Sequence, residues 1–226
     1  MSALAVTFII PVLNEEGVVG PLLQRLVRCY PASECLVVDG GSSDGTVVEA
    51  SALGCKVISS EPGRAVQMNA GASVARGAYL FFLHADTVPG ISAGNLQRIL
   101  ESRPSWGFFA VRLSGGHRVF RIIERAMNLR SMLTAVATGD QLLFVRRELF
   151  DSSGGFAPIP LMEDIEYCKR LRKGASPIYV RQAVETSSRR WEQGGLIITV
   201  LRMWALRLAY FLGVSPTRLK AYYADV

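Results

Sequence analysis

Residues 79–86 read Tyr-Leu-Phe-Phe-Leu-His-Ala-Asp, five apolar residues followed by a segment with two polar side chains. A short apolar run of this kind predicts a strand buried on both faces of a sheet. In open α/β sheets, ligands bind outside the carboxyl ends of the strands. Asp86 stands at such an end, two residues after His84, where it can hold a hard divalent cation against phosphate oxygens. The alternative is that Asp86 only caps the following turn.

The chain alternates between strand and helix patterns up to this run. Strand patterns cover residues 4–13, 35–39 and 55–59, and apolar residues at helical spacing follow at 18–30, 46–53 and 65–76. This order predicts a parallel, doubly wound α/β sheet flanked by helices. The ends of the first, second and fourth strands then meet at one edge, with the loop after the third strand beside them. The polar and loop residues expected there are Pro11, Asn14, Glu15, Asp39, Arg64 and Asp86.

Two loops at this edge carry the expected ligand contacts. Asn14 and Glu15 follow the first strand, and they can instead cap the next helix and complement its dipole. The second strand ends at Asp39 and runs into a glycine-rich turn that includes Gly41, where backbone can approach a ligand closely. The turn has neither the Gly-Lys-Ser/Thr of a phosphate loop nor the G-x-G-x-x-G spacing of a dinucleotide site.

The second half of the chain predicts further elements. We expect a helix after Pro89 to about residue 101, strands at 106–113, 142–145 and 178–184, and helices at 120–136 and 162–173. A loop rich in glycine and proline spans 151–161 and precedes Glu163 and Asp164. These two carboxylates can complement the helix dipole, or one of them can act as a general base in the cleft. Arg189, Arg190 and Trp191 form a basic, aromatic turn suited to gripping phosphate.

Length, composition and charge restrict the fold class and the kind of partner that this chain can have. Its 226 residues, half of them apolar, suit one α/β domain with a buried core and argue against disorder. Residues 1–111 hold 7 basic and 9 acidic side chains, and residues 112–226 hold 18 and 10. The second half is therefore near +8, which favours an anionic partner, although solvated helix faces account for part of the excess. No nucleic-acid-binding motif supports a nucleic-acid partner.

Cysteine usage and the N-terminus favour a cytoplasmic location. The spacing of Cys29, Cys35, Cys55 and Cys168 matches no zinc or redox motif, which predicts buried free thiols in a reducing compartment. The first residues lead straight into a strand, and we expect no signal peptide.

Residues 195–212 are strongly apolar and approach the length of a membrane span. Arg202 and Arg207 interrupt this segment, so a packed helix or a helix in a membrane interface is expected rather than a span.

Taken in order, these motifs resemble the family 2 glycosyltransferases of the GT-A fold. The resemblance rests on Ile-Pro-Val-Leu-Asn-Glu at 10–15, Val-Asp-Gly-Gly-Ser-Ser-Asp-Gly-Thr at 38–46, Asn69-x-Gly71 and Phe-Leu-His-Ala-Asp at 82–86. It covers nearly the whole chain. The chain is most similar to a small bacterial subgroup in which Pro-Gly-Arg at 62–64, Gln-Met-Asn at 67–69 and Leu-His-Ala-Asp-Thr at 83–87 recur.

The resemblance implies a role for each matching position. The residues implied in donor binding are Pro11, Asn14, Glu15, Asp39, Gly41, Arg64, Asn69, Ala85, Arg190 and Trp191. Asp86 would be the last carboxylate of the family's Asp-x-Asp element and would ligate Mn²⁺ or Mg²⁺ on the donor diphosphate. Asp164 would be the base that activates the acceptor hydroxyl, with Glu163 and Asp140 beside it.

One departure from the family pattern concerns the metal. His84 replaces the first aspartate of Asp-x-Asp. It is either a direct ligand, better suited to Mn²⁺ or a softer metal than to Mg²⁺, or a histidine hydrogen-bonded beneath the strand end.

The resulting prediction is a metal-dependent, inverting glycosyltransferase that uses a UDP- or GDP-linked sugar on a single GT-A domain, residues 1–226. Residues 1–111 would bind the nucleotide, 112–194 the acceptor, and 195–226 would form a helical tail that can contact a membrane on its cytoplasmic face. The acceptor is open, and a homodimer is compatible with the resemblance. Alternatives are a nucleotidyltransferase or another sugar-nucleotide-processing enzyme, and a non-catalytic nucleotide- or membrane-binding domain.

Overall fold

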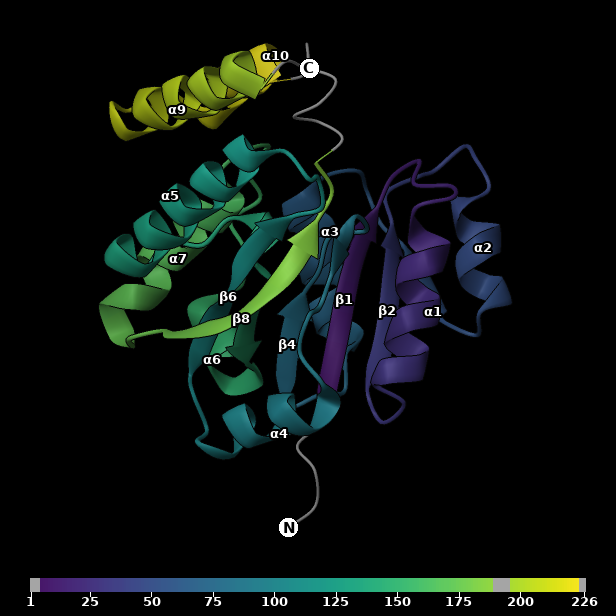
Figure 1. The fold of residues 1–226 in the computed structure, drawn as a ribbon. Helices are drawn as coiled ribbons and strands as arrows, with labels where there is room; N and C mark the ends of the chain where they lie inside the picture. The colour runs from purple at the N-terminus through teal and green to yellow at the C-terminus, as the bar shows by residue number, and fades with distance from the viewer. Residues whose placement is uncertain (1–4, 189–195, 224–226) are drawn as a thin grey trace.

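The N-terminal half of the chain forms the parallel part of one sheet (Figure 1). A computed structural model describes residues 5–188 and 196–223 of the protein. Strand β1 (Val6–Val12) pairs in parallel with β2 (Glu34–Asp39) on one side and with β4 (Tyr79–Phe82) on the other, and β3 (Lys56–Ser59) extends the sheet beyond β2. Helices α1 (Val19–Cys29), α2 (Thr46–Ala52) and α3 (Arg64–Val74) connect these strands. The predicted β-α alternation is confirmed.

The C-terminal half completes an eight-stranded sheet of order β3-β2-β1-β4-β7-β6-β8-β5. Strand β7 (Leu143–Arg146) runs antiparallel to both β4 and β6 (Trp106–Leu113), and β8 (Ile178–Thr186) runs parallel to β6. The short β5 (Thr87–Val88) pairs antiparallel with β8. The sheet is therefore mixed, with its parallel half on the side of β1.

The remaining elements are the helices α4 (Ala93–Glu101), α5 (Arg118–Thr134), α6 (Arg147–Ser153) and α7 (Glu163–Gly174), the 3₁₀ turn η1 (Gly139–Gln141), and the C-terminal helices α9 (Leu196–Phe211) and α10 (Pro216–Tyr223). Strand β5 and the turn η1 were not expected from the sequence, and α10 is a separate helix within the expected helical tail. Strand β5 is too short to show a period. The signal for α10 is a proline at its first position, where the missing N–H costs nothing.

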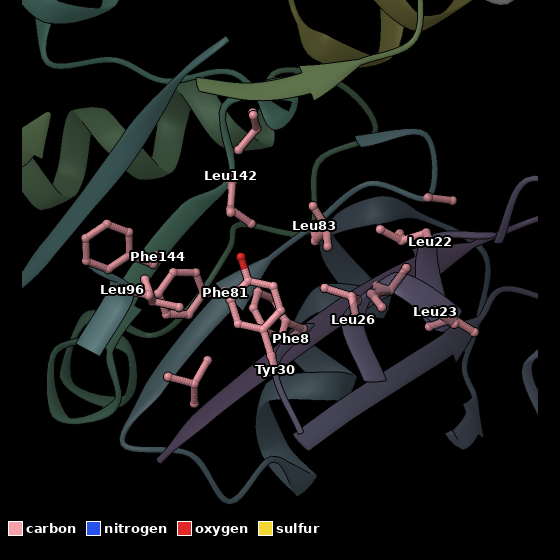
Figure 2. Close-up of a cluster of buried hydrophobic side chains, with 14 of the residues drawn as sticks. Phe8, Leu22, Leu23, Leu26, Tyr30, Phe81, Leu83, Leu96, Leu142 and Phe144 are labelled. Carbon is pink, nitrogen blue, oxygen red and sulfur yellow. The ribbon is translucent and has the colours of Figure 1, made fainter. Parts of the chain in front are cut away.

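The two faces of β1 bury alternate side chains. Phe8 points to the α1 side, where it packs with Phe81, Tyr30 and the leucines of α1 (Figure 2). Its neighbour Ile9 points to the opposite side, where it packs with Met68 of α3. This alternation is the period of two of a strand, and burial on both faces explains why every residue of β1 except Thr7 is apolar.

The four cysteines are free thiols. Cys168 is buried as expected, whereas Cys29, Cys35 and Cys55 are only half-buried because they lie at the ends of α1, β2 and β3. Within residues 5–188 and 196–223, no helix is both long enough and apolar enough to cross a bilayer.

Helix α3 lies unusually close to the sheet at Gly71. A Cβ atom added there would stand 2.4 Å from Cγ2 of Ile9 and 2.9 Å from Cγ2 of Val38. We predict that Gly71→Ala destabilises the protein by about 1–3 kcal/mol through overpacking, despite the better helix propensity of alanine. The matched control is Gly94→Ala in α4, where the added Cβ meets nothing within 4 Å.

Urea unfolding followed by circular dichroism measures both variants. Gly94→Ala should leave stability unchanged or raise it by a few tenths of a kcal/mol, up to about 1 kcal/mol. An unaltered midpoint for Gly71→Ala would contradict the close approach of α3 to β1.

Candidate active site

The carboxyl ends of β1 and β2 are held together by one buried side chain. Val12 lies opposite Asp39 in the parallel register, so both strands end at the same edge. The side-chain amide of Gln67, from α3, donates hydrogen bonds of 2.8 Å to the carbonyls of Val12 and of Val38. The Val12 carbonyl also accepts a 3.0 Å hydrogen bond from the Gly40 N–H, so the amide of Gln67 adds a second bond there and joins the two strand ends.

The loops that follow β1 and β2 are joined by hydrogen bonds. The Asn14 N–H donates to Oγ of Ser42 at 2.9 Å, and the Ser43 N–H donates to Oδ1 of Asn14 at 2.9 Å. The Glu15 N–H donates to Oγ1 of Thr46 at 2.7 Å. The alternative of Asn14 as a helix cap is wrong, since α1 begins after Val18 without a side-chain cap. Asn14 instead adopts a left-handed φ of 54° and fixes one loop against the other.

Asp39 holds the glycine-rich turn through hydrogen bonds to its backbone. Its carboxylate is 5% exposed and accepts hydrogen bonds from the N–H groups of Gly41 and Ser42 at 3.1 Å. Gly41 has a φ of 96°, a conformation that residues with a Cβ rarely adopt. The turn therefore folds back over the strand end with its backbone at the edge where Asn14 and Glu15 lie.

Asp86 lies on the surface just beyond the end of β4. Its carboxylate accepts a 3.2 Å hydrogen bond from Oγ1 of Thr87, and its backbone carbonyl accepts one from the Ser187 N–H at 3.1 Å. Ser187 follows β8, so this contact ties the end of β4 to the exit of the last strand. Ala85, expected near the donor, is 5% exposed, and Pro11 is half-buried in β1.

His84 faces the second half of the protein. Its Nδ1 atom lies 3.6 Å from Oδ1 of Asp140 in η1. The imidazole also lies directly against Gly139, since a Cβ there would be 2.1 Å from the Cε1 atom of the ring. Both contacts follow from the pairing of β4 with β7, which begins immediately after η1.

The donor set at this edge fits a cation shared with a ligand. In the part of the chain that the structure describes, no three His, Cys, Asp or Glu side chains gather as a self-contained metal cage. A cation that bridges diphosphate oxygens needs only one or two protein ligands, and an exposed carboxylate such as Asp86 meets that requirement. An imidazole such as that of His84 suits Mn²⁺.

Asp164 has the environment expected of a general base. Its Oδ2 atom accepts a 2.8 Å hydrogen bond from the Gly139 N–H, and Oδ1 accepts one of 2.7 Å from the Ile165 N–H. Burial, together with the neighbouring Glu163, raises the pKa of Asp164 to about 6 despite these hydrogen bonds. A carboxyl group that titrates near neutrality, held firmly in position, can take up a proton from a substrate.

Arg64 connects the nucleotide edge with these acids. Its Nη1 atom lies 3.9 Å from Oε1 of Glu163, whose side chain is nearly fully buried. Burial opposes the charged guanidinium, but Glu163, Asp140 and Asp164 outweigh it and raise the pKa of Arg64. The first turn of α3 and the first turn of α7 therefore face each other across the candidate site.

Sequence reasoning missed two residues behind the site. Gln141 is fully buried; its Oε1 atom accepts hydrogen bonds from the Ser131 hydroxyl at 2.6 Å and the Thr138 N–H at 3.2 Å. These contacts fix η1, which carries Asp140. Burial lowers the pKa of Arg130, which lies near enough to Asp164 and Asp140 to interact with their charges. For Gln141, the available signal was a glutamine directly before an apolar strand.

Asn69 makes its contacts with a loop. Its Nδ2 donates to the Phe156 carbonyl at 2.8 Å, and its Oδ1 accepts from the Phe156 N–H at 2.9 Å. This pair of bonds holds the loop that leads into α7, and a donor contact for Asn69 stays a prediction. Arg189, Arg190 and Trp191 lie outside the described residues.

The fold and the residues at this edge of the sheet indicate a class of protein. A parallel βαβ half with ligand-facing loops at its carboxyl edge, completed by a carboxylate from a second half, is typical of nucleotide-binding α/β proteins.

Comparison with known proteins shows which family the N-terminal part of the chain resembles. The model of glycosyl transferase family 2 matches residues 7–102. A dodecaprenyl-phosphate galacturonate synthase from Rhizobium johnstonii is 31% identical over 98 residues, which cover 38% of this chain and 29% of that protein. The chain thus spans under a third of this curated relative. Over residues 7–102, the resemblance to family 2 glycosyltransferases is confirmed.

Solved structures agree on the fold. Glucosyl-3-phosphoglycerate synthase from Mycobacterium tuberculosis, in complex with Mn²⁺, UDP and phosphoglyceric acid, is 19% identical with a TM-score of 0.64, over 93% of this chain and 79% of that one. A mannosyltransferase from Pyrobaculum calidifontis, in complex with GDP-Man and Mn²⁺, is 18% identical with a TM-score of 0.63, over 90% and 60%. The GT-A fold class is confirmed.

The raised pKa of Asp164 makes stability depend on pH. Its folded pKa of about 6 lies above the ordinary value of 3.8, so the folded state binds the proton more tightly and wild-type stability falls as pH rises from 4 through 6. Asp164→Asn removes this titration. We predict that the variant gains on the order of 2 kcal/mol relative to wild type between pH 4 and pH 8.

Urea denaturation at both pH values measures this change. The readout is how the difference in unfolding free energy between Asp164→Asn and wild type changes from pH 4 to pH 8. The size of this difference at a single pH is not the readout, because asparagine also alters the hydrogen bonds. A difference that is the same at pH 4 and pH 8 would show that Asp164 titrates normally.

Proposed function

We propose that this protein is an inverting glycosyltransferase that moves a sugar from a UDP- or GDP-linked donor to an acceptor hydroxyl, with a divalent cation. The observation that carries the proposal is Asp164, a carboxyl group with a pKa of about 6 held 2.8 Å from the Gly139 N–H. Its neighbour Glu163 lies 3.9 Å from Arg64, which belongs to the segment that matches the family model.

The donor nucleotide would bind at the edge formed by the loops after β1 and β2. Asn14, Glu15, Asp39 and Gly41 already form one hydrogen-bonded unit there. A preformed unit loses little conformational freedom on binding, which favours affinity. Similar folds in complex with UDP or GDP-mannose support a nucleotide-sugar ligand.

Asp86, together with His84, would hold the cation on the donor diphosphate. When bound, Mn²⁺ or Mg²⁺ supplies positive charge that stabilises the departing nucleoside diphosphate. Asp86 is suited to this role because it is exposed and because Thr87 orients it. Arg64, the first residue of α3, would add a second positive charge.

Asp164 would perform the proton transfer. The acceptor hydroxyl gives its proton to the Asp164 carboxylate while its oxygen forms a bond to the anomeric carbon of the sugar. The bond from that carbon to the diphosphate breaks on the opposite face, and the configuration inverts. Glu163 positions Arg64 through their 3.9 Å contact, and Asp140 positions His84.

The first test is calorimetric titration of UDP and of GDP with and without Mn²⁺. We expect one nucleotide to bind in a metal-dependent manner, and Asp86→Asn to lose at least tenfold in affinity, as removal of a charged ligand costs well over 1.4 kcal/mol. The control is Asp151→Asn, an exposed carboxylate on α6, with unchanged affinity. If Asp86→Asn binds the nucleotide as tightly as Asp151→Asn does, Asp86 is not part of the binding site.

The second test concerns Asp164 and uses turnover with the donor identified in this way. Wild-type kcat/KM should rise with pH through about 6, because the carboxylate must be ionised to accept a proton. Asp164→Asn should lower kcat by about 10²–10⁴ with donor affinity kept. Glu166→Gln, in the same helical turn but paired with Arg170, is the matched control and should keep most activity. Full turnover by Asp164→Asn would end the assignment.

A further inference from the structure

The outward side of α9 is apolar. Large side chains recur there every three or four residues, and each is between 59% and 76% exposed. We call this surface the α9 stripe; it consists of Ile198, Leu201, Trp204, Leu208 and Phe211 of α9, together with Leu212 directly after the helix. An ordinary surface helix turns such a face toward the core.

The charged residues of α9 lie away from the stripe. Arg202 is half-buried and donates a 2.7 Å hydrogen bond to the carbonyl of Tyr222 in α10. Arg207 is also half-buried, and Leu206 next to it is 5% exposed. The arginines of α9 therefore face the protein, whereas its large exposed apolar side chains face outward. This is the reverse of an ordinary amphipathic surface helix.

The surroundings of the stripe are basic and aromatic. The described residues 196–223 contain four basic side chains and no acidic one. Arg218 and Lys220 of α10 are exposed, and so is Tyr222. Lys169 of α7 lies 4.9 Å from the ring centroid of Tyr210, so it adds positive charge beside α9. Exposed tyrosine and tryptophan with basic residues are typical of helices that lie in the interface of an anionic membrane.

A second copy of the chain fits this surface less well. A two-fold interface places the same patch on itself, so the basic residues Arg218 and Lys220 would be brought against an equally basic patch of the other copy. The described part of α9 and α10 offers no carboxylate to neutralise them. Anionic lipid headgroups supply that charge, and the acyl boundary accepts the apolar side chains.

We propose that the α9 stripe docks this protein on the surface of an anionic lipid bilayer. The 16 residues of α9 are too few to span it, so the helix lies in the interface plane, with Arg218 and Lys220 against lipid phosphates. The inner side of the pair packs through Leu206 and Leu219 on Met162 and Ile165, which flank Asp164. Docking would therefore bring the acceptor side of the site near the bilayer, a consequence that rests on the proposed function, whereas docking itself does not.

Vesicle co-sedimentation of the whole chain tests the proposal. Wild-type protein should sediment with vesicles of phosphatidylcholine and phosphatidylglycerol far more than with phosphatidylcholine alone. Leu201→Gln with Leu208→Gln should lower the partition coefficient by roughly tenfold per residue. Arg218→Gln with Lys220→Gln should lower it several-fold and weaken its dependence on salt. Val27→Gln with Val48→Gln, two exposed positions on α1 and α2, is the matched control and should bind like wild type.

Trp204 reports on insertion directly. Brominated lipids should quench its fluorescence in wild type, and the quenching should largely disappear in Trp204→Phe. Circular dichroism of each variant confirms that it is folded. Wild type that stays in solution with anionic vesicles, or that binds as well without Leu201 and Leu208, would overturn the proposal. So would a dimer in sedimentation velocity that the stripe variant dissociates, with no vesicle binding by either protein.

Discussion

The two-sided pairing of β4 is the constraint on which the candidate site depends. On one side β4 runs parallel to β1, and on the other it runs antiparallel to β7. Its carboxyl end therefore lies beside the amino end of β7, where Phe82 pairs with Leu143. A fully parallel sheet would place η1 at the opposite edge. The change of direction thus brings Asp140 within 3.6 Å of His84, although 55 positions separate them in the sequence.

Buried amides hold this junction more than ion pairs do. Gln67 bridges the ends of β1 and β2, and Gln141 fixes the turn before β7. Both amides are buried. The partners of Gln67 are at the ends of β1 and β2, and those of Gln141 lie next to η1. A shift of these segments would therefore leave a buried polar group without its partner. By contrast, the contact of Arg64 with Glu163 is long at 3.9 Å and partly exposed, which leaves the guanidinium able to turn toward a ligand.

Much of the fold could be predicted because burial leaves periodic patterns in the sequence. The apolar runs located β1, β2, β4 and β6 within two residues, and the strand-end rule predicted that Asn14 and Asp39 share an edge. The roles of Asn14 and Asn69 could not be read in this way. Both residues bond backbone groups that are far away in sequence, and such bonds depend on loop paths that have no period. The reverse direction of β7 had no sequence signal either, since an apolar strand of four residues reads the same for both directions.

The loop that Asn69 holds has a consequence for proton affinity. It ends at Met162, whose φ of 67° turns the chain into α7 just before Asp164. Met162 and Ile165 pack with Leu206 and Leu219, so the C-terminal helix pair covers the residues on both sides of Asp164. Because burial is the largest cause of the raised pKa of Asp164, water admitted by a displacement of that pair would lower this pKa. The pKa of Asp164 therefore depends on the packing of α9 and α10 against the start of α7.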